Sequence, residues 1–244
     1  MRIAEIFLGS SSSSALCMSD MTVYNRRATC TCHSIMSSSL LGQHPSSQRL
    51  SDYLISISAQ DTPEVKSYPD AVYFNYYSMG LSLLFSPQNN YKPTTGLKRE
   101  DLRDDNLILD SIDFYNVPKP ISSLAGGIVK LPHTAELAFS TFPVSPFTLS
   151  LSAQPPPTAP AARPSSFEIV PTTSGKDFVA VLGEPDRKGG GAGPSTGSIG
   201  IWCEWSMDGI MVEFGGVEAR GPQAWERGKD AIWRVITVFP PKSA

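Results

Sequence analysis

The sequence has no long apolar run, and this absence limits where the protein can act. No stretch approaches the roughly 18 consecutive apolar residues that a transmembrane helix needs. The apolar run Ile6–Leu8 is also too short for the core of a secretory signal peptide. We therefore expect a cytoplasmic protein. The many serines near the start, with Arg26 and Arg27 after them, leave a mitochondrial transit peptide as the alternative.

Charge is also scarce, since Asp, Glu, Lys and Arg make up only 18% of the 244 residues and the formal net charge is -3. The basic residues are scattered along the chain. Proteins that bind nucleic acids neutralise phosphates with a concentrated patch of Lys and Arg. We therefore expect no nucleic-acid partner.

Cysteine is rare, and its spacing does not favour a metal site. The run Cys30-Thr31-Cys32-His33 lacks both the usual C-x2-4-C spacing and a second pair of ligands, so no bound metal is predicted. Cys203 lies between Trp202 and Glu204 in a predicted strand, where a reduced thiol in the core is expected.

The residues that usually perform catalysis are missing from the best-defined part of the chain. Residues 175–239 contain no histidine that could serve as the base of a catalytic triad. Asp70, Asp110 and Asp113 are interpreted as solvated carboxylates at turns and strand edges instead of a catalytic pair. The sequence thus predicts a protein that is not an enzyme, with no catalytic residues and no cofactor.

What is present predicts an α+β fold made of two small modules. Residues 1–46 are Ser-rich and are expected to be a disordered leader. A first module spans 47–117, a middle segment with the proline-rich stretch Gln154–Pro164 spans 118–166, and a second module spans 167–240. The proline-rich stretch is expected to separate the modules or to loop out between them. It contains Pro157-Thr158-Ala159-Pro160, the tetrapeptide that the ESCRT-I ubiquitin-variant domain recognises, which we interpret as a chance match.

Each module is expected to be an antiparallel hairpin with a third strand and short covering helices. The hairpin VYFNYYSMGLSLLF (Val72–Phe85) matches IWCEWSMDGIMVEF (Ile201–Phe214) in architecture, so the chain contains a weak internal repeat. The third strands are predicted within Asn106–Tyr115 and Ile232–Phe239. Helices are predicted at Ser47–Ser58, Lys176–Leu182 and about 222–231, and those of the second module should cover the face that carries Cys203 and Trp205.

The candidate binding residues lie in the second module. Trp202 and Trp225 are candidates for partner contact because Trp is frequent at interaction hot spots, whereas Trp205 and Trp233 are expected in the core. Arg187 and Lys188 precede a glycine-rich loop. A phosphate-binding enzyme that uses Arg187–Gly193 is the alternative hypothesis, although a P-loop lies between a strand and a helix and this loop is predicted between a helix and a strand.

The order of motifs over about residues 68–116 and 175–239 resembles the phagosome assembly factor 1 family. The likeness consists of AVYFNYYSMGLSLLF (Ala71–Phe85), IDFYNVP (Ile112–Pro118), Val181-Leu182-Gly183-Glu184-Pro185 and the hairpin and last strand after it. The resemblance implies a non-enzymatic protein that works with a WD-repeat propeller partner at the forming autophagosomal membrane. It also implies small α+β units built on antiparallel sheets, and a peripheral association with the phagophore membrane.

Overall fold

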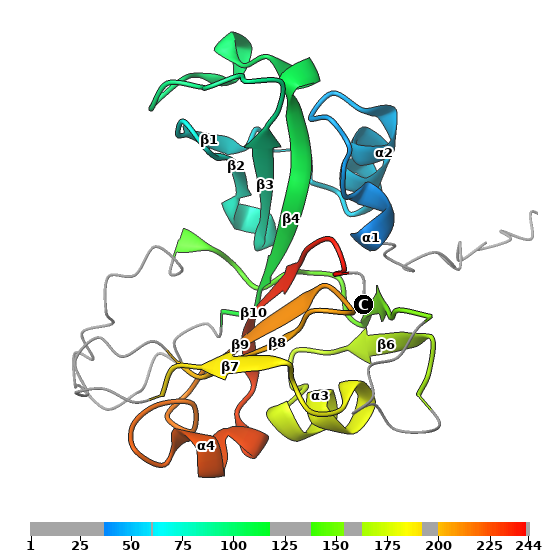
Figure 1. Cartoon of the computed structure of the whole chain (residues 1–244), viewed down its shortest axis with the longest axis vertical. Helices are drawn as coiled ribbons and strands as arrows, with labels where there is room; N and C mark the ends of the chain where they lie inside the picture. The colour runs from blue at the N-terminus through cyan, green and yellow to red at the C-terminus, as the bar shows by residue number, and fades with distance from the viewer. Residues whose placement is uncertain (1–36, 60, 118–137, 154–162, 192–199, 243–244) are drawn as a thin grey trace, which may run out of the picture. The chain divides into compact units, whose positions relative to one another are not determined.

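The structure is a computed structural model that describes residues 37–59, 61–117, 138–153, 163–191 and 200–242 (Figure 1). Residues 1–36 of the predicted leader lie outside this set. Residues 37–46 belong to the folded part of the chain: Leu40 is buried in the core, and the backbone of Gly42 and of Gln43 bonds to that of Leu109. The folded region therefore begins before residue 47, where the sequence placed its boundary.

The central feature of the described chain is an eight-stranded sheet in which all neighbouring strands are antiparallel. From one edge to the other the strands are β1 (Glu64–Ser67), β2 (Val72–Tyr76), β3 (Leu81–Pro87), β4 (Leu107–Tyr115), β10 (Trp233–Val238), β9 (Ile210–Phe214), β8 (Trp202–Trp205) and β7 (Arg187–Gly189) (Figure 1). With its helices, the chain has the mixed α+β architecture that the sequence predicts. The strands of both predicted modules lie in this one sheet, because β4 pairs with β10.

The helices are short, and the sequence explains where they start. They are α1 (Ser37–Leu40), α2 (Gln48–Ser56), α3 (Gly175–Leu182), α4 (Ala224–Arg227) and the 3-10 turns η1 (Tyr77–Met79), η2 (Arg99–Asp101), η3 (Asp104–Asn106) and η5 (Gly228–Asp230). Ser47 caps α2 by accepting a hydrogen bond from the Leu50 amide at 3.3 Å. Ser174 and Asp177 cap α3 together, with 2.8 Å from the Ser174 amide to the carboxylate.

The same order of elements occurs on both sides of the β4–β10 pair. The first half, residues 48–115, runs from α2 through β1, β2, β3 and two 3-10 turns to β4. The second half, residues 175–238, runs from α3 through β7, β8, β9, α4 and η5 to β10. The hairpins β2–β3 and β8–β9 therefore hold corresponding places, as the comparison of their sequences indicates.

The turns of the two hairpins also correspond. Gly80 and Gly209 have left-handed backbones, with φ of 57° and 66°. A Cβ at Gly80 would collide with the Ser140 carbonyl oxygen, and one at Gly209 with the Phe239 carbonyl oxygen. Both turns thus require glycine for the same two reasons.

One face of the sheet carries the hydrophobic core. In the second half Cys203, Trp205 and Phe214 point to this face, and the ring of Phe178 on α3 lies 6.2 Å from Trp205 and 5.9 Å from Phe214 between centroids. The prediction that this face packs against a helix is confirmed. Trp205 and Trp233 are buried, as expected.

The flanks of the proline-rich stretch form a separate two-stranded sheet. Strand β5 (Phe147–Ser150) pairs antiparallel with β6 (Ser166–Ile169), so the two strands that flank the proline-rich stretch in sequence are neighbours. The base of this connection is tied to the β8–β9 turn. Asp208 accepts a hydrogen bond from the Ser152 amide at 2.9 Å and forms a buried ion pair with Arg163. The tetrapeptide 157–160 lies outside the described residues.

Candidate functional site

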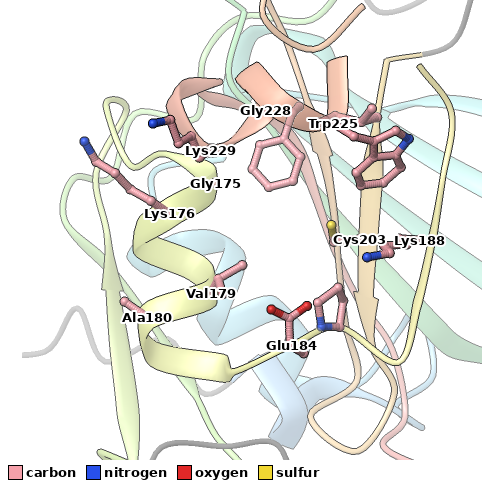
Figure 2. A pocket seen from close by; sticks show the side chains of 13 residues that line it. Gly175, Lys176, Val179, Ala180, Glu184, Lys188, Cys203, Trp225, Gly228 and Lys229 are labelled. Atoms are coloured by element: carbon pink, nitrogen blue, oxygen red, sulfur yellow. The ribbon is translucent and has the colours of Figure 1, made fainter. Parts of the chain in front are cut away.

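The candidate site is a groove of about 490 Å³ in the second half, between α3 and the α4–η5 connection (Figure 2). We call it the α3 groove. Its floor is apolar and consists of the side chains of Ile201, Cys203 and Phe214. One wall is α3, and Trp225 and Lys188 lie across from it (Figure 2). The remaining lining residues are Gly175, Lys176, Val179, Ala180, Glu184, Pro185, Gly228 and Lys229.

Glycines close one end of the α3 groove. The Gly175 amide donates to the Ala231 carbonyl at 2.9 Å, and a Cβ at Gly175 would collide with the Gly228 carbonyl oxygen. A Cβ at Gly228 would in turn collide with the Ile201 side chain. The start of α3 and η5 therefore approach each other closely, and this contact fixes the spacing of the two walls.

Trp225 gives the groove its most exposed apolar surface, with 44% of the residue accessible to solvent. The ammonium of Lys188 lies over the indole at 5.6 Å from the ring centroid, as in a cation–π contact. Val179 on the opposite wall is also exposed, at 37%. A large apolar side chain of another molecule could therefore pack between these walls.

The charged side chains around the α3 groove are mostly cationic. Lys176, Lys188 and Lys229 line it together with one carboxylate, Glu184. Lys176 has an ion-pair partner in Asp230, but the atoms are 3.8 Å apart and both side chains are more than half exposed. Such a surface pair contributes little to stability and can be exchanged for another partner. The rim thus favours a negatively charged ligand.

Cys203, on the floor of the groove, is a free and buried cysteine, as the sequence predicts. Burial raises the pKa of its thiol to about 11. The thiol is therefore neutral at physiological pH and lacks the thiolate character of a catalytic nucleophile. Its role in the groove is one of size and shape.

The structure brings two of the four predicted binding residues together and separates the other two from them. Lys188 and Trp225 meet at the groove. Arg187 points to the opposite face of the sheet, where its guanidinium pairs with Glu204 at 3.1 Å. Trp202 also lies on that face, beside Gly189. The four predicted residues therefore do not form one surface, because successive side chains of a strand point to opposite sides.

The same alternation bears on the predicted phosphate loop. The sequence places Arg187–Gly193 in a loop, but Arg187–Gly189 forms the edge strand β7. Its two cations diverge, since Arg187 lies with Glu204 and Lys188 with Trp225. Arg187 and Lys188 therefore cannot bind the same phosphate from strand β7.

Sequence reasoning missed Val179, Lys176 and Lys229 as groove residues, because their positions depend on how α3 packs against η5. One signal was available for the floor. When the two hairpin sequences are aligned, Cys203 stands opposite Phe74. A small residue in the place of a core aromatic indicates a cavity.

The predicted exposure of the aspartates to solvent is correct for some of them and wrong for others. Asp70 is exposed, as expected for a turn. For Asp113 the predicted solvation is wrong: it lies at the β4–β10 pair and accepts a hydrogen bond from the Thr237 hydroxyl at 2.7 Å. Burial raises the pKa of Asp113 to about 6, and the nearby Glu213 carboxylate adds to this while the hydrogen bond opposes it.

Comparison with protein-family models, with curated protein sequences and with solved structures found no match for this chain. The resemblance to the phagosome assembly factor 1 family therefore stays a prediction from the residues. Within the described residues, no helix is both long and apolar enough to cross a membrane. The same part of the chain holds no cluster of three or more His, Cys, Asp or Glu side chains suited to a metal ion.

Proposed function

We propose that the protein is a non-enzymatic adaptor that binds a protein partner through the α3 groove. The observation that carries this proposal is the exposed Trp225–Lys188 pair beside the apolar floor of the α3 groove. Trp is enriched at interaction hot spots, where it contributes a large rigid surface. Trp225 and the exposed Val179 border the same groove, and a contiguous apolar patch of this kind marks an interaction site.

The setting of the adaptor follows from the resemblance of its motifs. We propose a role in autophagy or membrane trafficking, with a WD-repeat propeller as partner, at the phagophore membrane. The internal repeat supports this scaffold function, since two small α+β modules offer separate surfaces on one rigid sheet. The low charge and scattered basic residues favour a protein partner over nucleic acid.

The alternative, a phosphate-binding enzyme that uses Arg187–Gly193, has less support. Its two cations lie on opposite faces of β7, and the thiol nearest to them is neutral. Thermal-shift assays with nucleotides and phosphorylated metabolites test it. A shift that Lys188→Ala abolishes would favour the enzyme over the adaptor.

Affinity capture of the full chain from starved cells tests the adaptor directly. We expect the wild-type protein to recover a WD-repeat propeller or another autophagy protein. Trp225→Ala and Lys188→Glu should each lower recovery by about tenfold or more, as truncation of a hot-spot residue does. Arg187→Ala is the matched control, because this residue is adjacent to Lys188 but lies on the other face. If wild type recovers no such protein, the proposed function is wrong.

A further inference from the structure

The α3 groove occupies the place that an aromatic ring fills in the first half. Phe74, which aligns with Cys203, is 3% exposed, and its ring lies 4.9 Å from that of Phe85 between centroids. Phe85 aligns with Phe214, which lines the groove. Cys203 is much smaller than Phe, so the floor of the groove is a core position left partly empty.

The segments that join β3 to β4 and β9 to β10 also differ between the halves, and they increase the difference between the filled position at Phe74 and the groove at Cys203. In the first half, Arg99 of η2 lies over the Phe74 ring at 5.0 Å from its centroid and is held there by Asp104. In the second half the connection carries Trp225, which stands at the side of the groove and leaves the floor open (Figure 2). The first half is closed at this site by its own side chains, whereas the described residues of the second half leave the α3 groove beside Cys203.

The distribution of charge indicates which occupant fits. Lys176 and Lys229 lie together at the end of the groove where α3 begins, with their ammonium groups directed away from Trp225, and Lys188 lies across the groove beside Trp225 (Figure 2). The cations are thus on separate walls with an apolar floor between them. A peptide with carboxylates on either side of an apolar residue matches cations on both sides of an apolar floor.

We propose that the α3 groove binds an acidic amphipathic segment of a partner protein. One large apolar side chain of the segment packs on Cys203 between Val179 and Trp225, in the space that Phe74 fills in the first half. Flanking carboxylates of the segment pair with Lys176, Lys188 and Lys229. This inference rests on the proposed adaptor function and names the chemistry of the segment that the adaptor binds.

A defined peptide array tests the inference. The probes are labelled octapeptides with two central positions varied among Phe, Leu, Trp and Ala, flanked on both sides by Glu or, in a second set, by Lys. Binding to the full chain is measured by fluorescence anisotropy. We expect saturable binding of acidic peptides with a Phe, Leu or Trp centre, and at least about tenfold weaker binding when the centre is Ala or the flanks are Lys.

Filling the groove is the decisive variant. Cys203→Phe should place a ring where the first half has one and weaken binding of the acidic peptides at least about tenfold. Thermal melting checks that this variant is folded, and Lys188→Glu and Trp225→Ala test the site without changing the floor. Arg187→Glu, an equal charge change on the opposite face, should leave the affinity nearly unchanged.

Three results would overturn the inference. They are equal binding by wild type and a folded Cys203→Phe, absence of binding by every acidic peptide, and groove-dependent binding to phosphatidylserine vesicles without peptide binding. The affinity capture described above separates these failures from failure of the adaptor function. If wild type recovers the propeller partner and Trp225→Ala loses it while no acidic peptide binds, the adaptor function stands and only the proposed chemistry of the bound segment is wrong.

Discussion

The two halves of the sheet share a backbone plan and differ in a few side chains, among them those that line the α3 groove. Tyr76 and Trp205 occupy the same aligned position, and both are buried. Phe74 and Cys203 also correspond, but one fills the core and the other leaves a groove. The comparison teaches that the repeated apolar pattern maintains the fold, while departures from it show where the second half is specialised.

A second departure lies in the hairpin turns. The first half has Met79, which is packed partly against the core, where the second half has Asp208. The Asp208 side chain is fully buried and paired with Arg163, whose side chain is 4% exposed. The second half thus has a buried charge at a position where an apolar side chain suffices in the first.

Replacement of Asp208 gives the largest expected effect. Asp208→Met should lower the free energy of unfolding by about 3–5 kcal/mol, because it leaves the Arg163 guanidinium buried without a counter-charge. The double variant Asp208→Met with Arg163→Met should recover most of this loss, since an apolar pair carries no desolvation cost. Urea denaturation of the three proteins measures both steps.

An exposed aspartate provides the control for charge removal. Asp105→Met should change the free energy of unfolding by no more than about 0.5 kcal/mol, as surface substitutions usually do. If the double variant is as unstable as Asp208→Met, an apolar side chain such as Met79 cannot replace the buried ion pair at this turn, and the comparison of the two halves fails there.

The turn glycines test whether the halves respond alike. Gly80→Ala and Gly209→Ala should each cost about 1–3 kcal/mol for the left-handed backbone alone, and more for the collision with a carbonyl oxygen. Chemical denaturation should therefore show similar losses for the two variants. A large loss at one glycine with none at the other would break the proposed correspondence.

The stability of the protein should depend on pH through Asp113, which lies where the two halves of the sheet meet. The pKa of this carboxyl rises from its ordinary value of 3.8 to about 6 in the folded chain, chiefly by burial. Between those pH values the folded state holds a proton that the unfolded state has lost, so stability falls as pH rises from about 4 to 6. Below this window the two states are both protonated, and above it the penalty is constant.

Asp113→Asn removes this titration and keeps an acceptor for Thr237. The variant should be about 1–3 kcal/mol more stable than wild type at pH 7, with a difference that disappears near pH 3. Thermal melts across this range measure it. A constant difference at all pH values would show that Asp113 is not the titrating group.

The sequence predicts the fold well where a pattern is local. Alternating apolar residues locate both hairpins, and Ser47, Gly183 and Pro185 mark helix ends in the predicted places. The β4–β10 pair is not predicted, because residues 113 and 237 are far apart in the chain and strand patterns do not name their partners. Burial of Asp113 follows from that pair and was therefore missed as well.

The candidate site is predicted only in part for a related reason. Trp202 and Trp225 are recognised by their residue type, and Arg187 and Lys188 as cations of an expected glycine-rich loop, but Arg187–Gly189 forms strand β7. Once Arg187–Gly189 is a strand, the faces separate. The groove itself needs the packing of α3 against η5, which no residue pattern specifies.

The most direct test of the account is the fraction of a propeller partner that the full chain retains from cell extract when its groove is filled. At matched protein levels, Cys203→Phe should retain at most about a tenth of the partner that wild type retains, while its thermal stability is unchanged or higher. Equal retention by the two proteins would contradict the claim that the second half binds its partner through the α3 groove.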